Sequence, residues 1–140
     1  MVDLPPEIIR AQIKQGAVYL FPIDEFPEKS HYCIILNKNP LSDPILIYVY
    51  ITKNVSRVVS CNNNSRDTLV FIGPEEYPIL KFPSIIDCNE LHTITLQDLI
   101  TKNSKNELRI IEEISEYIWN KIANGVLASK RIESIYKKLI

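Results

Sequence analysis

The feature that most constrains the fold is an unbroken apolar run, Ile45–Thr52, with the sequence ILIYVYIT. Loop chemistry precedes it in Asn37–Pro44, where Pro, Asn, Asp and Ser side chains favour turns. An apolar run of strand length that is bounded by turns and rich in β-branched and aromatic residues predicts a strand buried on both faces. We therefore expect Ile45–Thr52 to be the central strand of a sheet.

Several further segments have the composition of strands. Gly16–Ile23 and Ser30–Asn37 are β-branched and aromatic-rich, and a turn-prone stretch between them predicts a connection over Asp24–Lys29. Between the central run and the later strands, Lys53–Arg66 is polar and asparagine-rich, which predicts a loop. We expect further short strands at Thr68–Ile72, Ile79–Lys81 and Ser84–Asp87.

Helical patterns lie at both ends of the chain. Leu4–Lys14 predicts a short amphipathic helix that ends before Gly16, and Thr95–Ile100 predicts another. Ser104 and Glu107 have capping-box spacing, so we expect a helix that starts there, presents a stripe from Leu108 to Ile122 and stops at Asn124-Gly125. A last amphipathic helix is expected over Ser129–Leu139.

Strands grouped before helices favour an α+β fold with an antiparallel, strongly curved sheet over a Rossmann-type alternation. The 140 residues contain no internal repeat and no long linker, so we expect a single domain over residues 1–140, with helices in residues 104–140.

Composition and charge exclude several classes of protein. Hydrophobic residues make up 46% and charged residues 24%, as in globular chains, and a net charge of −1 excludes a polybasic nucleic-acid binder. Three cysteines cannot all pair and no leader-like segment is seen, so we expect a reduced protein of the cytoplasm. No apolar run approaches the ~18 residues of a membrane span, and three glycines allow no Gly-rich phosphate loop.

A zinc site is the first candidate to weigh. His31-x-Cys33 and Cys88-x-x-x-His92 would supply a Cys₂His₂ set, but these spacings match no common zinc motif. Buried thiols are the simpler interpretation, because cysteine is often buried as a small hydrophobe. We therefore expect neither a metal nor another cofactor.

The segment Lys53–Arg66 is the second candidate. It carries Lys53, Arg57 and Arg66 and no acidic residue, and its Asn and Ser side chains are of the kind that contact phosphates and base edges. A phosphate-binding loop and an ordinary solvated loop remain equally open from composition alone.

The third candidate is a pair at two strand ends, His31 and Thr52. If these strands are neighbours, an imidazole, a hydroxyl and the ammonium of Lys29 or Lys53 converge at one rim of the sheet. Histidine can act as general acid or base near neutral pH, while a cation stabilises charge developing on phosphorus. Such a set could cleave RNA without metal, with the 2′-hydroxyl as nucleophile. The alternative is that His31 is simply a half-exposed polar residue.

Three segments together resemble the MazF/PemK (Kid) toxins of bacterial toxin–antitoxin systems. They are GAVYLFPI from residue 16, HYCIIL from residue 31 leading to YITK at residues 50–53, and PSIIDCNELHTI from residue 83. In that family a G-D-[VI] strand precedes an R-P-A-V-V strand, a P-[IVL]-T-[ST] strand end and an S-x-[VIL]-[DL]-x-[LV]-R-T-[IL] segment. The similarity covers roughly residues 16–99.

The resemblance implies a compact SH3-like barrel over residues 16–99 that usually forms a homodimer. It also implies a metal-independent endoribonuclease that cleaves single-stranded RNA and is neutralised by a cognate antitoxin protein. The family's active-site arginine falls on His31, its strand-end threonine on Thr52 and the next hydroxyl residue on Lys53. The loop that approaches RNA would include Arg57 and Arg66, and Lys29 would add a phosphate contact.

The chain departs from the family pattern at three places. His31 replaces the arginine, Tyr32 replaces the proline after it, and Ala17 replaces an aspartate. Arginine is always charged, whereas histidine is only partly protonated near pH 7. Either His31 acts as acid or base while Lys29 or Lys53 supplies charge, or the chain does not cleave RNA. In the second case it is a binding module on the same fold that acts through a protein partner.

Overall fold

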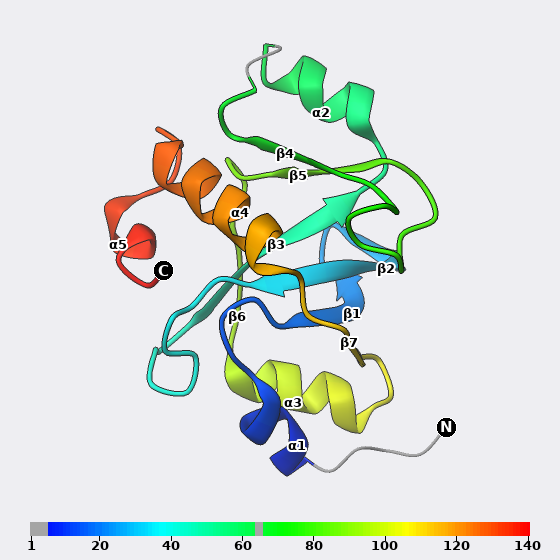
Figure 1. The fold of residues 1–140 in the computed structure, drawn as a ribbon. Helices are drawn as coiled ribbons and strands as arrows, with labels where there is room; N and C mark the ends of the chain where they lie inside the picture. The colour runs from blue at the N-terminus through cyan, green and yellow to red at the C-terminus, as the bar shows by residue number, and fades with distance from the viewer. Residues whose placement is uncertain (1–5, 64–65) are drawn as a thin grey trace.

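The computed structural model describes residues 6–63 and 66–140, and it shows an α+β protein built on one sheet (Figure 1). The helices are α1 (Pro6–Gln12), α2 (Val55–Cys61), α3 (Leu96–Ser104), α4 (Glu116–Ala128) and α5 (Ser134–Lys137). The strands are β1 (Val18–Ile23), β2 (Phe26–Ile35), β3 (Leu46–Thr52), β4 (Leu69–Ile72), β5 (Ser84–Asp87), β6 (His92–Ile94) and β7 (Arg109–Ile111). None of the helices in the described ranges is both long and apolar enough to span a membrane.

The sheet is antiparallel and has the strand order β4-β5-β3-β2-β1-β7, with β6 paired to β3. The prediction that the run at residues 45–52 forms the central strand is confirmed. One edge of β3 serves two partners, because its first half pairs with β6 and its last residues, Ile51 and Thr52, pair with β5. This change of partner lets the sheet curl, so the predicted strongly curved antiparallel sheet is also confirmed.

Strand alternation gives the sheet two buried faces, because successive side chains point to opposite sides. On one face Ile34 and Val49 belong to a core that includes Ile122 of α4. On the other face Cys33 and Tyr48 belong to a core that includes residues of α1 and α3. Figure 1 shows α4 on one side of the strands and α1 with α3 at the opposite end of the molecule.

The predicted capping box at Ser104 is wrong. Ser104 is the last residue of α3, and the chain turns at Asn106, which has a left-handed φ of 59°. The next residues form β7, which pairs with the free edge of β1. Tertiary pairing therefore overrides the helical pattern that starts at Leu108, and residues 104–140 are not all helical. The helix α4 begins after Ser115, whose hydroxyl accepts a hydrogen bond from the Ile118 N–H at 3.2 Å.

Gly125 does not end α4, which continues to Ala128. A Cβ on Gly125 would lie 2.8 Å from the Sγ of Cys88, so glycine is required there for close packing against the sheet rather than as a helix terminator. The final helix is also shorter than the predicted Ser129–Leu139, since only Ser134–Lys137 is helical.

Three predictions about the middle of the chain are also wrong in part. The predicted loop Lys53–Arg66 contains α2, whose C-cap Asn62 donates to the Val58 carbonyl at 2.8 Å and to Asp87 at 3.1 Å. The predicted strand Ile79–Lys81 is not a strand but an irregular segment that lines the same cavity as the end of β3. The predicted turn Asp24–Lys29 is shorter, because β2 already begins at Phe26.

Candidate active site

Sheet register brings His31 and Thr52 to the same end of two neighbouring strands. In the ladder between β2 and β3, Cys33 faces Tyr50 and Tyr32 faces Ile51. The ladder ends at this last pair, and His31 of β2 and Thr52, the last residue of β3, are the next residues beyond it. Both side chains point to the same face of the sheet, because they lie two residues from Cys33 and Tyr50, respectively. The two strands are therefore neighbours, and both strand ends line the same cavity.

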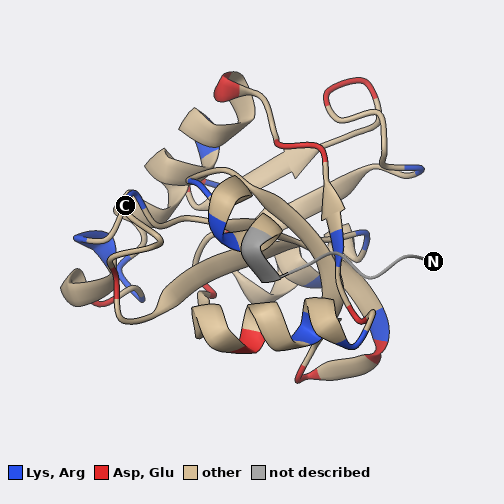
Figure 2. Cartoon of the chain, turned by 90° about the horizontal axis from the view of Figure 1, so that it is seen from below, with Lys and Arg blue, Asp and Glu red and all other residues tan. Residues whose placement is uncertain are grey.

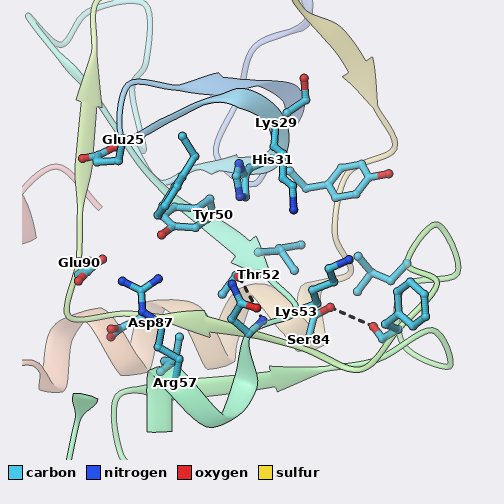
Figure 3. A pocket seen from close by; sticks show the side chains of 18 of the residues that line it. Glu25, Lys29, His31, Tyr50, Thr52, Lys53, Arg57, Ser84, Asp87 and Glu90 are labelled. Carbon is cyan, nitrogen blue, oxygen red and sulfur yellow. Dashed lines mark hydrogen bonds between the residues drawn. The ribbon is translucent and has the colours of Figure 1, made fainter. Parts of the chain in front are cut away.

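The rim opens into a cavity of about 750 Å³, and five of the six residues predicted for the site line it. They are Lys29, His31, Thr52, Lys53 and Arg57 (Figure 3). Arg66 is the exception, because it is absent from the lining and its guanidinium lies over the ring of Phe71 at 5.1 Å. The structure thus brings together strands β2 and β3 and helix α2, but not the end of the predicted loop.

The cavity is not uniformly basic, because four cationic and four acidic side chains line it, Glu28 and Lys81 among them. Of the residues labelled in Figure 3, Lys29 and Lys53 lie at one end, and Glu25, Glu90 and Asp87 lie at the other with Arg57 beside them. Over the whole chain, acidic and basic positions are interspersed (Figure 2), in agreement with the net charge of −1. The acid-free segment seen in the sequence therefore does not make an acid-free site, because other segments bring carboxylates to it.

His31 sits between two aromatic rings at the middle of the cavity. Its ring centroid lies 5.7 Å from that of Phe26 and 5.0 Å from that of Tyr50, in an edge-to-face arrangement with the latter. Its Nδ1 is buried and has no hydrogen-bond partner within residues 6–63 and 66–140. Burial lowers the pKa of His31 below its ordinary value, and the Lys29 ammonium acts in the same direction, although the Lys29 backbone opposes the shift. The imidazole is therefore neutral at pH 7, which suits a proton acceptor.

Thr52 and Lys53 form the opposite wall. The Thr52 hydroxyl accepts a hydrogen bond from the Asn54 N–H at 3.2 Å, which holds its oxygen at the strand end and leaves its own proton available for donation. The Lys53 ammonium lies 5.4 Å from the ring centroid of Phe82, a side chain that is 56% exposed. This cation–π contact keeps the ammonium at the rim without neutralising it.

A polar network fixes helix α2, which carries Arg57, to the rest of the protein. Asn89 donates to Asn62 at the end of α2 at 3.0 Å and to Thr68 at 2.7 Å. Its Oδ1 accepts from the hydroxyl of Ser129, the residue that follows α4, at 2.7 Å. Asp87 joins the network by accepting from both Asn62 and Asn89. Asp87 is thus a positioning group for α2 rather than a free carboxylate of the site.

Several lining residues were missed at the level of sequence. Tyr50 could have been found, because it shares the face of Thr52 by strand alternation. Glu25 and Phe26 enter through the tight β1–β2 hairpin, and Glu90 enters through the segment between β5 and β6. Phe82 reaches the site from a turn, and no periodic pattern in the sequence points to its position.

The zinc interpretation finds no support in the geometry. Within the described residues, no group of three His, Cys, Asp or Glu side chains is placed to hold a metal ion. Cys33 and Cys88 belong to the cores on opposite faces of the sheet, which separates the two half-sites considered from the sequence. Cys33, Cys61 and Cys88 are all free thiols, and burial raises the pKa of Cys33 and, to about 12, that of Cys88.

Comparison with known proteins gives a structural match only. No protein-family model matches the sequence, and no curated protein matches it. Among solved structures, a match with a TM-score of 0.55 and 14% sequence identity covers 86% of this chain and 97% of the other. That structure is described as an endoribonuclease in complex with its cognate antitoxin from mycobacterial species.

The chain shares its fold with that endoribonuclease. The match covers most of both chains, so the similarity extends over most of this fold. The resemblance to MazF/PemK toxins inferred from three sequence segments is therefore supported at the level of the fold.

Proposed function

We propose that the protein is a metal-independent endoribonuclease that cleaves single-stranded RNA at the cavity between β2, β3 and α2. The observation that carries the proposal is that His31 and Thr52, at the same end of two paired strands, line one cavity with four cationic side chains. The fold shared with a known endoribonuclease adds support. A neutral imidazole, a hydroxyl and ammonium groups are together sufficient for cleavage that uses the RNA's own 2′-hydroxyl.

In this mechanism His31 is the general base. Its neutral imidazole takes the proton of the 2′-hydroxyl as the 2′-oxygen forms a bond to phosphorus, and the bond from phosphorus to the 5′-oxygen breaks. The leaving 5′-oxygen takes up a proton from solvent, which reaches the cavity past the exposed side chains of Lys29 and Lys53. The products are a 2′,3′-cyclic phosphate and a 5′-hydroxyl, so atoms and charge balance.

Charge stabilisation in this mechanism comes from residues other than His31. Because burial keeps the imidazole neutral, His31 does not replace the positive charge of the family's arginine. We assign the contacts with the non-bridging phosphate oxygens to Lys29 on β2 and to Lys53 after β3, because both lysines line the cavity near His31. The Thr52 hydroxyl donates a hydrogen bond to the same phosphate, and Arg57 contacts a neighbouring phosphate of the RNA.

We further propose that an antitoxin protein neutralises the enzyme and that the active form is a homodimer. The similar endoribonuclease was determined with its cognate antitoxin, which supports the first of these statements. Three free thiols support a reducing, cytoplasmic location. Arg66, which lies outside the cavity, would contact RNA only beyond the cleavage site.

The test is incubation of the purified protein with single-stranded RNA in excess EDTA. We expect cleavage by the wild type and a loss of about 10²- to 10⁴-fold in His31→Ala, the usual effect of removing a general base. Thr52→Val should also lower the rate, whereas Thr93→Val, an exposed threonine outside the cavity, should not. No cleavage by the folded wild type, or equal cleavage by His31→Ala, would refute the proposal.

One observation favours a second function, that of a binding module that acts on a protein partner. The cavity has as many carboxylates as cations, which is less suited to a polyanion than a basic groove is. Expression in a bacterial host separates the two functions. Growth arrest with loss of cellular RNA supports the nuclease, and growth arrest with intact RNA supports the binding module.

A further inference from the structure

A second cavity, of about 480 Å³, adjoins the candidate active site. The two cavities share five lining residues, namely Glu25, Phe26, Tyr50, Arg57 and Glu90. The second cavity extends away from the lysines, toward His92 on β6 and toward Tyr136 of α5. It therefore lies next to the acidic end of the candidate active site.

Aromatic rings connect the two cavities. The Tyr50 ring lies 5.0 Å from that of His31 and 5.2 Å from that of His92, which is stacked on Tyr48 at 5.5 Å. Phe26 lines both cavities and is 38% exposed, so part of its ring is open to a ligand. Flat, partly exposed rings beside a phosphate site are typical of places where nucleobases stack.

Two carboxylates face this aromatic surface. Glu25 Oε1 lies 3.4 Å from His92 Nδ1, whereas Glu90 makes no ion pair or side-chain hydrogen bond with any part of the chain that the structure describes. Burial raises the pKa of Tyr50, and the nearby charges of Glu90 and Glu25 raise it further. Glu90 is thus free to accept hydrogen bonds from a bound molecule.

We propose that this second cavity is a nucleobase subsite that selects a base with an exocyclic amino group (cytosine, adenine or guanine) over uracil. The inference rests on the proposed RNA cleavage and specifies which RNA is cleaved. A base next to the scissile phosphate stacks on Phe26, and Glu90 accepts a hydrogen bond from its amino group.

The second cavity is lined by more carboxylates than cations, namely Glu25, Glu90 and Glu133 against Arg57 and Arg131. This excess favours a base over a second phosphate, because carboxylates repel a phosphate but accept hydrogen bonds from the amino groups of bases. Uracil presents a carbonyl oxygen where cytosine has its amino group, so uracil would place an acceptor against Glu90. With the phosphate held near Lys29 and Lys53, the adjoining base is directed to the acidic, aromatic end. The separation of charge along the site thus orients the RNA.

The experiment uses short RNAs that differ only at one base beside a single cleavable position. Cytosine is compared with uracil, and adenine with hypoxanthine, on each side of the scissile phosphate. We expect wild-type kcat/KM to be about tenfold higher for the amino-bearing base on one of the two sides. Glu90→Gln should reduce this preference to about twofold, because an amide can donate to the uracil carbonyl. The matched control Glu107→Gln, in an exposed turn outside both cavities, should keep it.

Binding provides a readout independent of cleavage. RNAs with a 2′-deoxyribose at the cleavable position bind but are not cleaved, so fluorescence anisotropy measures their Kd directly. We expect the same order, with cytosine tighter than uracil in the wild type and not in Glu90→Gln. Equal kcat/KM for all bases, or a preference that Glu90→Gln leaves intact, would overturn the subsite while leaving the nuclease in place. An absence of cleavage together with a base preference in Kd would overturn the nuclease alone.

Discussion

Removal of the Asn89 side chain should destabilise the protein and loosen helix α2. The Asn89 Nδ2 lies within hydrogen-bond distance of Asn62, Thr68 and Asp87, and its Oδ1 accepts from Ser129. Because an amide nitrogen has two hydrogens, at most two of the three donor contacts form fully at once, which gives about three hydrogen bonds in total. At about 1 kcal/mol each, Asn89→Ala should lower the free energy of unfolding by about 3 kcal/mol.

The measurement is thermal and chemical unfolding followed by circular dichroism. For a chain of this size a loss of about 3 kcal/mol corresponds to a fall in Tm of roughly 6–12 °C. Asn120→Ala, an exposed asparagine on α4, is the control and should change stability by less than about 0.5 kcal/mol. Because Asn62 caps α2, amide hydrogen exchange in α2 should also speed up in Asn89→Ala. A variant as stable as the control would show that the network does not hold α2 in place.

Three further predictions address the site and the core. Burial lowers the pKa of His31, and the neutral imidazole is the active form in the proposed mechanism. We therefore expect kcat/KM for RNA to stay constant from pH 8 to about 6.5 and to fall only below the lowered pKa. A decline in kcat/KM that begins above pH 7 would contradict the assignment. Lys53→Ala should weaken RNA binding and reduce the slope of log Kd against log salt by about 0.7, the value for one phosphate contact, whereas Lys105→Ala should leave the slope unchanged. Gly125→Ala should cost about 1 kcal/mol in urea unfolding, because its Cβ would lie 2.8 Å from the Cys88 Sγ. If the contact with Cys88 is the cause, the double variant with Cys88→Ala should be more stable than the sum of the single effects predicts.

The sheet and the strand-end pair were accessible from sequence because they depend on local patterns. The continuous apolar composition of residues 45–52 indicates a buried strand. The alternation of side chains along two neighbouring strands then predicts that His31 and Thr52 lie on one face of the sheet. Once β2 and β3 pair, these two strand ends lie at the same edge of the sheet. Burial and alternation can both be recognised within a segment of eight to ten residues.

The errors arose where a distant partner decides the local structure. Leu108 and Ile111 fit a helical stripe, but the open edge of β1 draws these residues into β7. Glycine often ends a helix, but Gly125 lies within α4, where the Sγ of Cys88 leaves no room for a Cβ. Lys53–Arg66 has loop composition, and α2 forms within it because Asn62 is tied to Asp87 and Asn89. No pattern within these segments reveals such partners.

The acidic part of the site was missed for the same reason. Lys53 and Arg57 lie close together in the sequence, whereas Glu25 and Glu90 come from a hairpin and from the segment between β5 and β6. The absence of acidic residues in Lys53–Arg66 therefore predicted a basic site, whereas the end of the cavity with Glu25 and Glu90 is acidic.

The helices α1 and α3 pack over only part of their face of the sheet, around Cys33 and Tyr48, and leave the stretch with His31, Tyr50 and Thr52 uncovered. Each of the two strands therefore has one portion that packs in the core and another that lines the cavity. Substitutions in the second portion can change the chemistry of the cavity without unfolding the chain. A stably folded variant with an altered cavity is consequently within reach of one or two changes, and under the proposed function it would serve as bait for isolating an inhibitor.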